Sequence, residues 1–300
     1  MEIGNVPNQN IIRKKRGFAI FLTIFAGCVL GTMDALSKQL IGSFEVIQVL
    51  WSRYFFHSVI VFGYLVLFCS KSVFISKKPK IQIQRSFTLF VATIAMYVSL
   101  DYLPLADAAS VQFSAPVLVT LISGIFLGEK IGKRRYIAVI IAFCGVLIIV
   151  QPGLEFRWAM LLPLIAAFML AIFLIQTRVL QSIDNAYTTL FYSTLIGTIF
   201  FISVTPFFWR QPTSEEWFFM LAQGSLGAIG HLAIIKALRY STASFLAPFL
   251  YSQLLIAIIL SVMYLGDPVT IMMCLGAFLI VASGIYIWYR EVFLINGGSS

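Results

Sequence analysis

Two charged side chains lie inside apolar stretches, and both are of types that can do chemistry. Asp34 falls in the stretch 17–38, and Arg53 falls in the stretch 45–69. A carboxylate can hold a cationic group or carry a proton, whereas a guanidinium can hold a carboxylate through two parallel hydrogen bonds. A charge at the centre of a membrane helix costs roughly 2.5–3.5 kcal/mol, so both residues are candidates for a binding site.

Each charge also has a simpler interpretation as half of an ion pair. Lys38 follows Asp34 by one helical turn on the same face, so these two could pair at the end of the stretch. Arg53 lies about 12 Å into its stretch by helical rise, where a charge needs a partner. Asp34 is the obvious partner at that depth. We therefore keep structural pairing and contact with a ligand as alternatives for both residues.

The two histidines, His57 and His231, can titrate near neutral pH. We interpret each as a hydrogen-bonded packing residue, with proton transfer as the alternative. No cysteine or carboxylate stands at ligand spacing from either one, so the sequence predicts no metal site. We expect no cofactor and no enzyme, because no nucleotide-binding glycine motif or cluster of catalytic groups is present.

Uncharged polar and aromatic residues inside the apolar stretches are further candidates for a binding cavity. Amides and hydroxyls can orient a polar ligand, and tyrosine rings can face a cation. With Asp34, Arg53 and His231, the candidates are Tyr97, Gln112, Ser114, Gln176, Tyr192, Gln223, Tyr251 and Gln253. Because aromatic residues make up 15% of the chain, contact with lipid is the simpler interpretation of any single ring.

Ten apolar stretches must position these residues. Hydrophobic residues make up 60% of the chain and charged residues 11%, with a mean hydropathy of +0.95. A helix crosses a bilayer with roughly 20 apolar residues, and helices satisfy their own backbone groups in lipid. The expected spans are 17–38, 45–69, 84–101, 107–127, 135–151, 157–178, 186–207, 215–236, 243–265 and 270–289. The sequence therefore predicts an all-α integral membrane protein with ten transmembrane helices.

The basic residues gather on one side of these spans. Of the 21 Lys and Arg residues, 17 lie in the loops and span ends on the side that holds the N-terminus, with Arg85 counted in the second loop. Lys38, Arg157 and Arg210 fall on the opposite side, and Arg53 is left deep inside a span. Basic loops stay in the cytoplasm, so we expect both termini to be cytoplasmic. The net charge of +9 is thus a signal of topology, and we expect no nucleic-acid partner.

The ten spans divide into two halves that resemble each other. Leu127-Gly128-Glu129 closes the fourth span, and Leu265-Gly266-Asp267 closes the ninth. Five spans are an odd number, so homologous halves would be inverted repeats. We predict a basic N-terminal tail (1–16), two repeats (17–151 and 157–290) and a flexible tail (291–300).

Prolines stand in the two spans that this match makes equivalent, Pro116 in the fourth and Pro248 in the ninth. A proline frees a backbone carbonyl and permits a kink. Interrupted helices at matching places in two halves are typical of transporter binding regions and gates. A packing kink without a role in transport is the alternative. Gly27 and Gly31 would also let the first span approach another helix closely.

The order of short motifs resembles a known family. Phe113-Ser114-Ala115-Pro116, Leu127-Gly128-Glu129-Lys130 and Gly145-Val146 resemble the EamA type of the drug/metabolite transporter (DMT) superfamily, over the chain from Gly17 to Tyr289. The S-adenosylmethionine uptake transporter subgroup is similar in Asp34-Ala35-Leu36-Ser37-Lys38, Ser43-Phe44-Glu45-Val46, Arg53-Tyr54-Phe55-Phe56, Leu190-Phe191-Tyr192-Ser193 and Ala247-Pro248. Two positions depart from the pattern, since Gln253 and Asp267 each stand where a glutamate is frequent.

The resemblance implies a secondary transporter that moves a small polar metabolite by alternating access through a central cavity. The best specific expectation is S-adenosylmethionine, whose sulfonium, ammonium and carboxylate suit Asp34 and Arg53. Export or exchange of amino acids or other metabolites is the alternative, and a channel or scramblase is the alternative from another class. Expected partners are the small-molecule substrate, the lipid bilayer, and protons or a counter-substrate. We expect a multi-pass monomer or homodimer in a bacterial inner (plasma) membrane.

Overall fold

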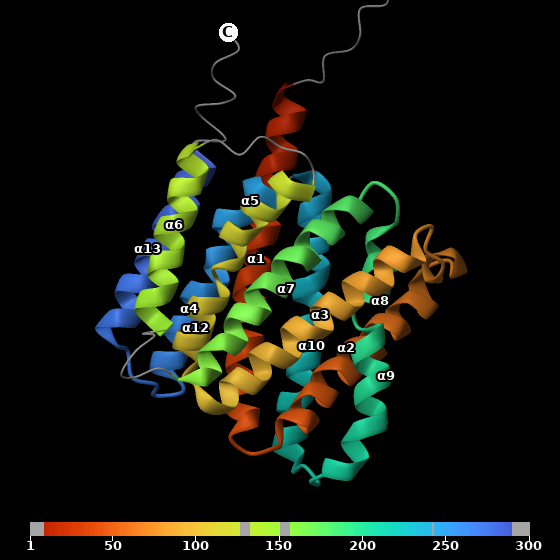
Figure 1. Cartoon of the computed structure of the whole chain (residues 1–300). Coiled ribbons are helices and arrows are strands. Elements are labelled where there is room, and N and C mark those ends of the chain that lie inside the picture. Colours follow the sequence, from red (N-terminus) through yellow and green to blue (C-terminus); the bar gives the residue numbers. More distant parts are fainter. Residues whose placement is uncertain (1–8, 127–132, 151–156, 242, 290–300) are drawn as a thin grey trace, which may run out of the picture.

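A computed structural model of the 300-residue chain describes residues 9–126, 133–150, 157–241 and 243–289 (Figure 1). These residues form helices and connecting turns, with no strand among them. The all-helical prediction is therefore confirmed for this part of the chain. Residues 1–8, the motif Leu127-Gly128-Glu129-Lys130 and the tail 290–300 lie outside it.

The helices follow the expected spans closely. The α-helices are α1 (Gln9–Ile41), α2 (Val46–Phe68), α3 (Pro79–Tyr102), α4 (Leu105–Gln112), α5 (Ala115–Phe126), α6 (Lys133–Val150), α7 (Leu161–Leu180), α8 (Ala186–Ser193), α9 (Leu195–Val204), α10 (Ser214–Tyr240), α11 (Ala243–Leu246), α12 (Tyr251–Met263) and α13 (Ile271–Tyr289). Short 3-10 helices are η1 (Lys71–Phe74), η2 (Trp158–Met160), η3 (Thr205–Phe208) and η4 (Ala247–Leu250).

Local sequence explains several helix starts. Thr213 accepts a hydrogen bond from the Glu216 backbone while Glu216 accepts one from the Thr213 backbone, which is a capping box for α10. Asn185 accepts from the Tyr187 backbone and caps α8. Pro79 occupies the first turn of α3, where its missing N–H costs nothing.

Six helical segments are long and apolar enough to cross a membrane. They are Arg16–Ile41, Val46–Phe68, Pro79–Tyr102, Trp158–Leu180, Ala186–Phe208 and Ser214–Tyr240. The other four expected spans correspond to shorter apolar helices, Leu105–Val119, Ile140–Val150, Tyr251–Met263 and Ile271–Tyr286. Apolar side chains also cover the outside of the bundle, as Phe21, Ile199 and Phe278 are 60–69% exposed. The molecule is thus a multi-pass membrane protein, while the total of ten spans stays a prediction.

Two interruptions lie beside prolines in the expected fourth and ninth spans. α4 ends at Gln112, and α5 begins at Ala115, just before Pro116. A proline at this position cannot donate to the carbonyl of Gln112, and its ring would collide with that carbonyl. In the ninth span the helix tightens to the 3-10 turn η4, which contains Pro248. The chain direction therefore changes inside both spans.

A third interruption, which the sequence analysis did not anticipate, divides the expected span 186–207 at Thr194 between α8 and α9. No proline is nearby. The Ser193 hydroxyl donates to the Thr189 carbonyl, and the Thr194 hydroxyl bonds Ser58 of α2 at 2.7 Å. Hydroxyls that compete for backbone carbonyls bend helices, and the contact with α2 holds the bend.

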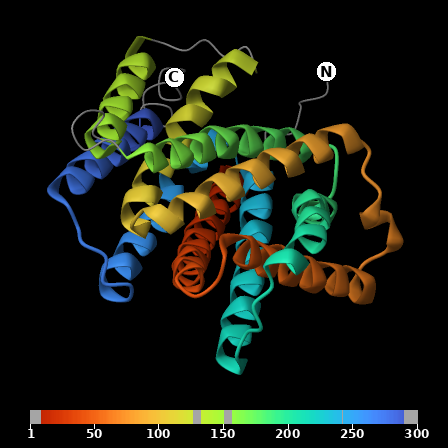
Figure 2. The ribbon, with the colours of Figure 1, turned by 60° about the horizontal axis from the view of Figure 1, so that its bottom comes forward.

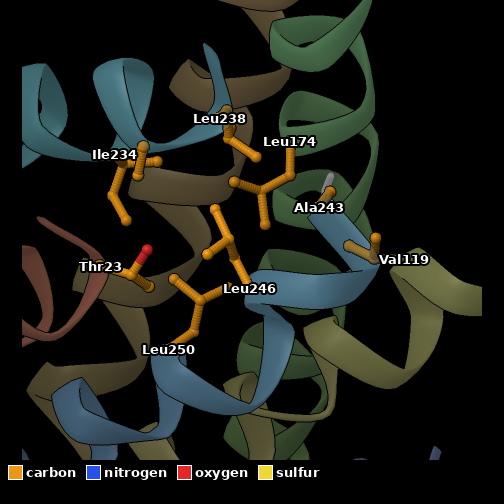
Figure 3. A pocket seen from close by; sticks show the side chains of 9 residues that line it. Thr23, Val119, Leu174, Ile234, Leu238, Ala243, Leu246 and Leu250 are labelled. Carbon is orange, nitrogen blue, oxygen red and sulfur yellow. The ribbon is translucent and has the colours of Figure 1, made fainter. Parts of the chain in front are cut away.

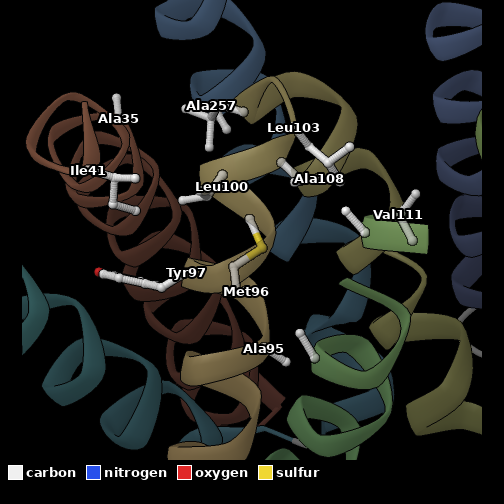
Figure 4. Packing of buried hydrophobic residues seen from close by; sticks show 14 of the residues in the cluster. Ala35, Ile41, Ala95, Met96, Tyr97, Leu100, Leu103, Ala108, Val111 and Ala257 are labelled. Atoms are coloured by element: carbon white, nitrogen blue, oxygen red, sulfur yellow. The ribbon is translucent and has the colours of Figure 1, made fainter. Parts of the chain in front are cut away.

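The helices pack in pairs that join distant parts of the chain. α1 lies along α10, α3 along α7, and α6 along α13. The α3–α7 pair runs across the molecule in both views, and the α6–α13 pair stands at one edge (Figures 1 and 2). A large apolar cluster that includes Tyr97, Leu100 and Leu103 of the α3 region, Ala108 of α4 and Ala257 of α12 fills the space near the C-terminal end of α1 (Figure 4).

Two glycines set the distance between α1 and α12. A Cβ on Gly31 would lie 2.9 Å from the Gln253 carbonyl oxygen, and one on Gly27 would lie 2.8 Å from the Gln253 backbone nitrogen. Only a residue without a side chain permits this approach. The contact brings Gln253 of α12 next to the face of α1 that carries Asp34, one turn beyond Gly31.

The phrase Leu265-Gly266-Asp267 ends the ninth span and joins it to the first half of the chain. Gly266 has φ of 68°, in the left-handed region that favours glycine. The turn places the Asp267 carboxylate at the start of α4, where Oδ2 accepts from the Leu105 backbone at 3.1 Å. An acidic group there satisfies a free N–H and complements the helix dipole.

Candidate functional site

Asp34 is buried in the middle of the bundle and held by one amide. Its side chain is 5% exposed, and Oδ2 accepts a hydrogen bond from Gln253 Nε2 at 2.7 Å. A carboxylate has room for several donors. Part of its hydrogen-bonding capacity is therefore available to another group.

Arg53 lies opposite and is held by an aromatic hydroxyl and an imidazole. Nη1 donates to the Tyr97 hydroxyl at 2.9 Å, and the guanidinium carbon lies 5.1 Å from the centre of the same ring. Nη2 lies 3.4 Å from His231 Nε2. A guanidinium carries five N–H donors in a planar fork, so Arg53 also keeps donors for a further partner.

The Tyr97 hydroxyl joins four helices. It bonds Ser37 Oγ of α1 at 2.7 Å and accepts from Gln223 Nε2 of α10 at 3.0 Å. Gln223 Nε2 also donates to Ser37 Oγ at 2.9 Å, and its Oε1 accepts from Ser52 of α2 at 3.0 Å. We call Ser37, Ser52, Tyr97 and Gln223 the Tyr97 network. Because its members are buried and bonded to one another, the network fixes the position of Arg53.

Asp34 and Arg53 line one cavity of about 70 Å³, which we call the charged compartment. The polar side chains around it are Asp34, Arg53, Thr93, Gln112, His231 and Gln253. Ligand pockets are usually about 300–1,000 Å³, and a water molecule needs roughly 10–15 Å³. The compartment therefore has space for a few water molecules, less than most ligands need.

In the part of the chain that the structure describes, Asp34 forms neither of the two ion pairs that the sequence suggested. No contact within 4.0 Å joins the Asp34 carboxylate to Arg53 or to Lys38. Lys38 instead donates to the carbonyls of Leu100 at 2.5 Å and Leu103 at 3.0 Å, at the C-terminal end of α3. Free carbonyls and the negative end of the helix dipole attract a cation there. Lys38 is thus an anchor of α3, and Asp34 and Arg53 face a shared space where their charges attract each other without a direct ion pair.

A second cavity of about 50 Å³ adjoins the charged compartment, and we call it the apolar compartment. The two share the side chains of Leu30, Leu170, His231 and Gln253. The rest of the wall of the apolar compartment includes Phe113, Pro116 and Phe173. The Phe173 ring also meets the His231 ring edge-on at 6.1 Å.

Beyond the apolar compartment the space narrows to about 10 Å³ between aliphatic side chains. Leu174, Ile234 and Leu250 belong to both spaces, and Leu246 completes the narrow part, which we call the leucine constriction. Figure 3 shows these side chains pointing toward one another. Thr23 is the polar residue in this wall, and its hydroxyl donates to the Ala19 carbonyl. The constriction has no chemistry of its own and closes the apolar compartment.

The structure gathers some of the predicted site residues and separates others. Asp34, Arg53, Gln112, His231 and Gln253 line the charged compartment, and Tyr97 and Gln223 hold Arg53 in place. Four others lie elsewhere and do not line either compartment: Ser114, Gln176, Tyr192 and Tyr251.

Three of these four residues make hydrogen bonds outside the two compartments. Gln176 accepts from Thr88 of α3 at 3.1 Å, Tyr192 donates to the Phe74 carbonyl at 3.3 Å, and Tyr251 donates to the Ile280 carbonyl at 3.2 Å. The Ser114 hydroxyl is buried at the interruption of the fourth span and has no partner among the described atoms. Tyr192 therefore offers no ring to a ligand in the cavity.

Ser37, Ser52 and Thr93 could not be singled out from the sequence, because serine and threonine are common inside membrane helices and carry no distinctive spacing. Arg85 is not the loop residue that its position next to the basic second loop had indicated. Arg85 is fully buried in α3. Nη1 donates to Thr177 of α7 at 3.2 Å, and Nη2 donates to Ser193 of α8 at 2.6 Å and to the Thr189 carbonyl. Its guanidinium also lies 4.8 Å from the centre of the Phe173 ring.

A buried cavity with unlike charges among spanning helices is typical of transporters, and comparison with known proteins decides the family. The model of the EamA-like transporter family matches residues 17–151 and again residues 157–289. This chain belongs to the EamA-like transporter family. It is a membrane transporter and not an enzyme, with a small-molecule substrate. The resemblance drawn from the motifs is confirmed.

Three curated relatives carry different substrate names. The S-adenosylmethionine uptake transporter of Rickettsia conorii is 25% identical over 88% of this chain and 90% of its own length. The riboflavin transporter of Vibrio cholerae is 30% identical over 68% of this chain and 70% of its own. The pseudopaline exporter of Pseudomonas aeruginosa is 23% identical over 76% of this chain and 81% of its own.

A solved crystal structure shares the fold. It superposes with a TM-score of 0.69 at 16% identity, covering 94% of this chain and 98% of the other. At this identity the likeness concerns the fold alone. The arrangement of helices described above is thus one that another protein adopts along nearly its whole length.

Proposed function

We propose that this EamA-family transporter is a secondary active carrier of a small zwitterionic, amino-acid-like metabolite, with S-adenosylmethionine as the best candidate. The observation that carries the proposal is the placement of Asp34 and Arg53. They line the same small cavity without a direct ion pair between them, and neutral groups hold each of them.

The cost of these charges supports a ligand with two unlike ends. A buried charge without an opposite partner is expensive to keep. An ammonium or sulfonium at Asp34 and a carboxylate at Arg53 would give each residue its missing partner. A ligand with one charge would leave the other residue uncompensated, so the pair selects for a zwitterion.

The relatives carry different substrate names, and one of them supports this class directly. The Rickettsia conorii relative, named for uptake of S-adenosylmethionine, covers most of the chain. The Pseudomonas aeruginosa relative is named an exporter, which supports export as the alternative direction, with amino acids or other metabolites as the alternative cargo. A channel or scramblase is less well supported, because the space next to the apolar compartment narrows to about 10 Å³ at the leucine constriction, which leaves no continuous pore there.

The fold proposed for this carrier is a pair of inverted five-helix repeats, ten spans in all. Three kinds of contact occur twice, at corresponding places in the two halves. Lys38 of α1 bonds the Leu100 carbonyl near the end of α3, and Arg178 of α7 bonds the Leu238 carbonyl near the end of α10 at 2.6 Å.

The second and third repeated contacts involve hydroxyls just before these basic residues. Ser37 donates to the Met33 carbonyl at 2.6 Å, and Thr177 donates to the Phe173 carbonyl at 2.7 Å. Gln223 of α10 bonds Ser37, as Arg85 of α3 bonds Thr177. In this third contact the donor lies on a helix of the other half both times, and this reciprocal arrangement supports inverted repeats.

We propose that the two halves rock about the charged compartment to give alternating access. Opening toward the side that holds the basic loops would move the side chains of the leucine constriction apart. The interruptions beside Pro116 and Pro248 would let parts of the fourth and ninth spans move. The positive-inside rule supports a cytoplasmic location of that side and of both termini, in a bacterial inner membrane. Protons or a counter-substrate would drive the cycle. Asp34 would bind the cationic group of the substrate in one step and the proton or counter-substrate in another.

Counterflow in proteoliposomes tests the proposal. Vesicles are preloaded in turn with S-adenosylmethionine, amino acids or nucleosides, and uptake of labelled compound is followed for wild type, Asp34→Asn, Arg53→Gln and the control Gln176→Leu. We expect trans-stimulated, saturable uptake of a zwitterion by wild type and the control, with loss in both charge variants. Zwitterion uptake that both charge variants retain would remove Asp34 and Arg53 from the mechanism. Absence of counterflow with every compound would contradict the carrier assignment.

A further inference from the structure

The adjoining compartments of the cavity differ in the chemistry of their walls. The first has charged and amide groups among its apolar wall residues, namely Asp34, Arg53, Gln112 and Gln253. Two aromatic rings, a proline and aliphatic side chains surround the second, among them Phe113, Pro116 and Phe173. A ligand that only occupied the charged compartment would leave this second wall without a role.

The partition between the compartments consists of side chains. Leu30, Leu170, His231 and Gln253 face both spaces. Leucine side chains change rotamer without backbone movement, so a ligand can displace them and join the two spaces. His231 and Gln253 would remain beside the junction as polar contacts, since each is bonded to Arg53 or Asp34.

We propose that the two compartments bind the two parts of one ligand, an α-amino-acid head in the charged compartment and a bulky, flat or apolar body in the apolar compartment. This inference rests on the proposed carrier function and narrows its substrate class. The Phe113 and Phe173 rings bind the body through apolar contact and ring stacking. Amino acids with short side chains leave the apolar compartment unfilled and bind more weakly.

The position of the tyrosines supports this assignment of roles. Tyr97 and Tyr192 were the sequence candidates for binding a ring or a cation, but Tyr97 lines neither compartment, and its hydroxyl holds Arg53. Tyr192 lies outside both compartments, bonded to the Phe74 carbonyl. Phe113 at the interruption of the fourth span and Phe173 of α7 are the rings that line the cavity.

The test compares ligands that carry the head, the body or both. Methionine supplies the head with a small side chain, S-adenosylmethionine and tryptophan supply head and aromatic body, and adenosine supplies a body alone. Binding is measured as the rise in unfolding temperature of the full-length protein in detergent, and transport is measured separately by counterflow. Two variants alter the apolar compartment, Phe113→Leu by removing a ring and Ala115→Leu by filling space. The control Phe90→Leu removes a ring from the α3–α9 contact, outside both compartments.

In wild type and the control, we expect compounds with both parts to bind at least about tenfold more tightly than methionine or adenosine, about 1.4 kcal/mol. Either folded compartment variant should reduce this preference to less than about threefold while leaving methionine binding unchanged. Equal binding of methionine and the larger amino acids to wild type would overturn the inference, and so would equal losses for both in the variants. Those results would leave the carrier function standing. Loss of counterflow for every compound is the separate result that overturns the carrier function.

Discussion

Gln253 of α12 donates its side-chain amide to Asp34 of α1 across 2.7 Å. The family resemblance led us to expect a glutamate at this position, and the chain has an amide instead. The contact shows that the Gln253 amide is a hydrogen-bond donor to the Asp34 carboxylate in the other half of the chain. A glutamate would instead place two carboxylates side by side, and one of them would have to hold a proton.

Removing this amide should weaken substrate binding. Gln253→Leu leaves Asp34 without its donor, and a hydrogen bond to a charged group contributes about 1.5–3 kcal/mol. Under the proposed function we expect the half-saturating substrate concentration in counterflow to rise about tenfold or more, with the protein still folded. Gln176→Leu is the matched control, because it removes an amide outside the cavity. Equal effects of the two substitutions would contradict a role for the Asp34–Gln253 contact.

Gly31→Ala should loosen the contact that creates this bond. The added methyl group would meet the Gln253 carbonyl oxygen and the Ile256 Cβ at 2.9 Å, so α1 and α12 must separate. Overpacking of this kind costs about 1–3 kcal/mol, which lowers the unfolding temperature by several degrees. Thermal unfolding in detergent measures the effect. Gly63→Ala is the control in α2, where nothing lies within 4 Å of the new atom, and an unchanged midpoint for both variants would contradict the close approach.

Arg85→Lys should destabilise the protein although it keeps the charge. The guanidinium bonds Thr177 of α7 and Ser193 of α8 from one planar group, and a single ammonium does not reproduce that fork. We expect a loss of about 2 kcal/mol or more, because a buried charge then lacks hydrogen bonds. Denaturant titration of the purified protein checks this. Arg239→Lys, on the exposed end of α10, should change stability by less than about 0.5 kcal/mol.

Asp184, in the loop between α7 and α8, should make stability depend on pH. Burial raises the pKa of its carboxyl, but hydrogen bonds from Ser76, the Lys77 backbone and Gln82, with the charge of Lys77, outweigh burial and hold the pKa below its ordinary value. The folded state therefore binds the proton less readily than the unfolded chain. This contribution to stability is present above about pH 4, the ordinary range of an aspartate, and is lost as pH falls through the folded-state pKa.

Asp184→Asn removes that titration. We expect wild type to unfold at a higher temperature than the variant at pH 7, and the difference to shrink as the pH falls below about 4. Glu45→Gln serves as the control, since Glu45 is exposed and its side chain makes no cap bond. A difference between wild type and Asp184→Asn that stays constant down to pH 3 would show that the hydrogen bonds do not depend on the ionised carboxylate.

The fold class was predictable because its signal is local. Apolar runs of bilayer length, few charges and short basic loops predicted the spans, and Pro116 and Pro248 stand beside two observed interruptions. The interruption at Thr194 was not predictable, because it depends on a contact with Ser58 of another helix. Backbone breaks without proline or glycine are decided by neighbours that are distant in sequence.

The sequence alone determined which residue types are costly in a membrane, and so it singled out Asp34 and Arg53. Only the tertiary structure decided that they line one cavity without pairing, that Tyr192 lies outside it, and that Arg85 is buried. The reason is physical. Lipid and protein interior are both apolar, so the pattern along a membrane helix does not reveal which face turns inward. Packing between the helices sets that rotation, and the rotation places the side chains.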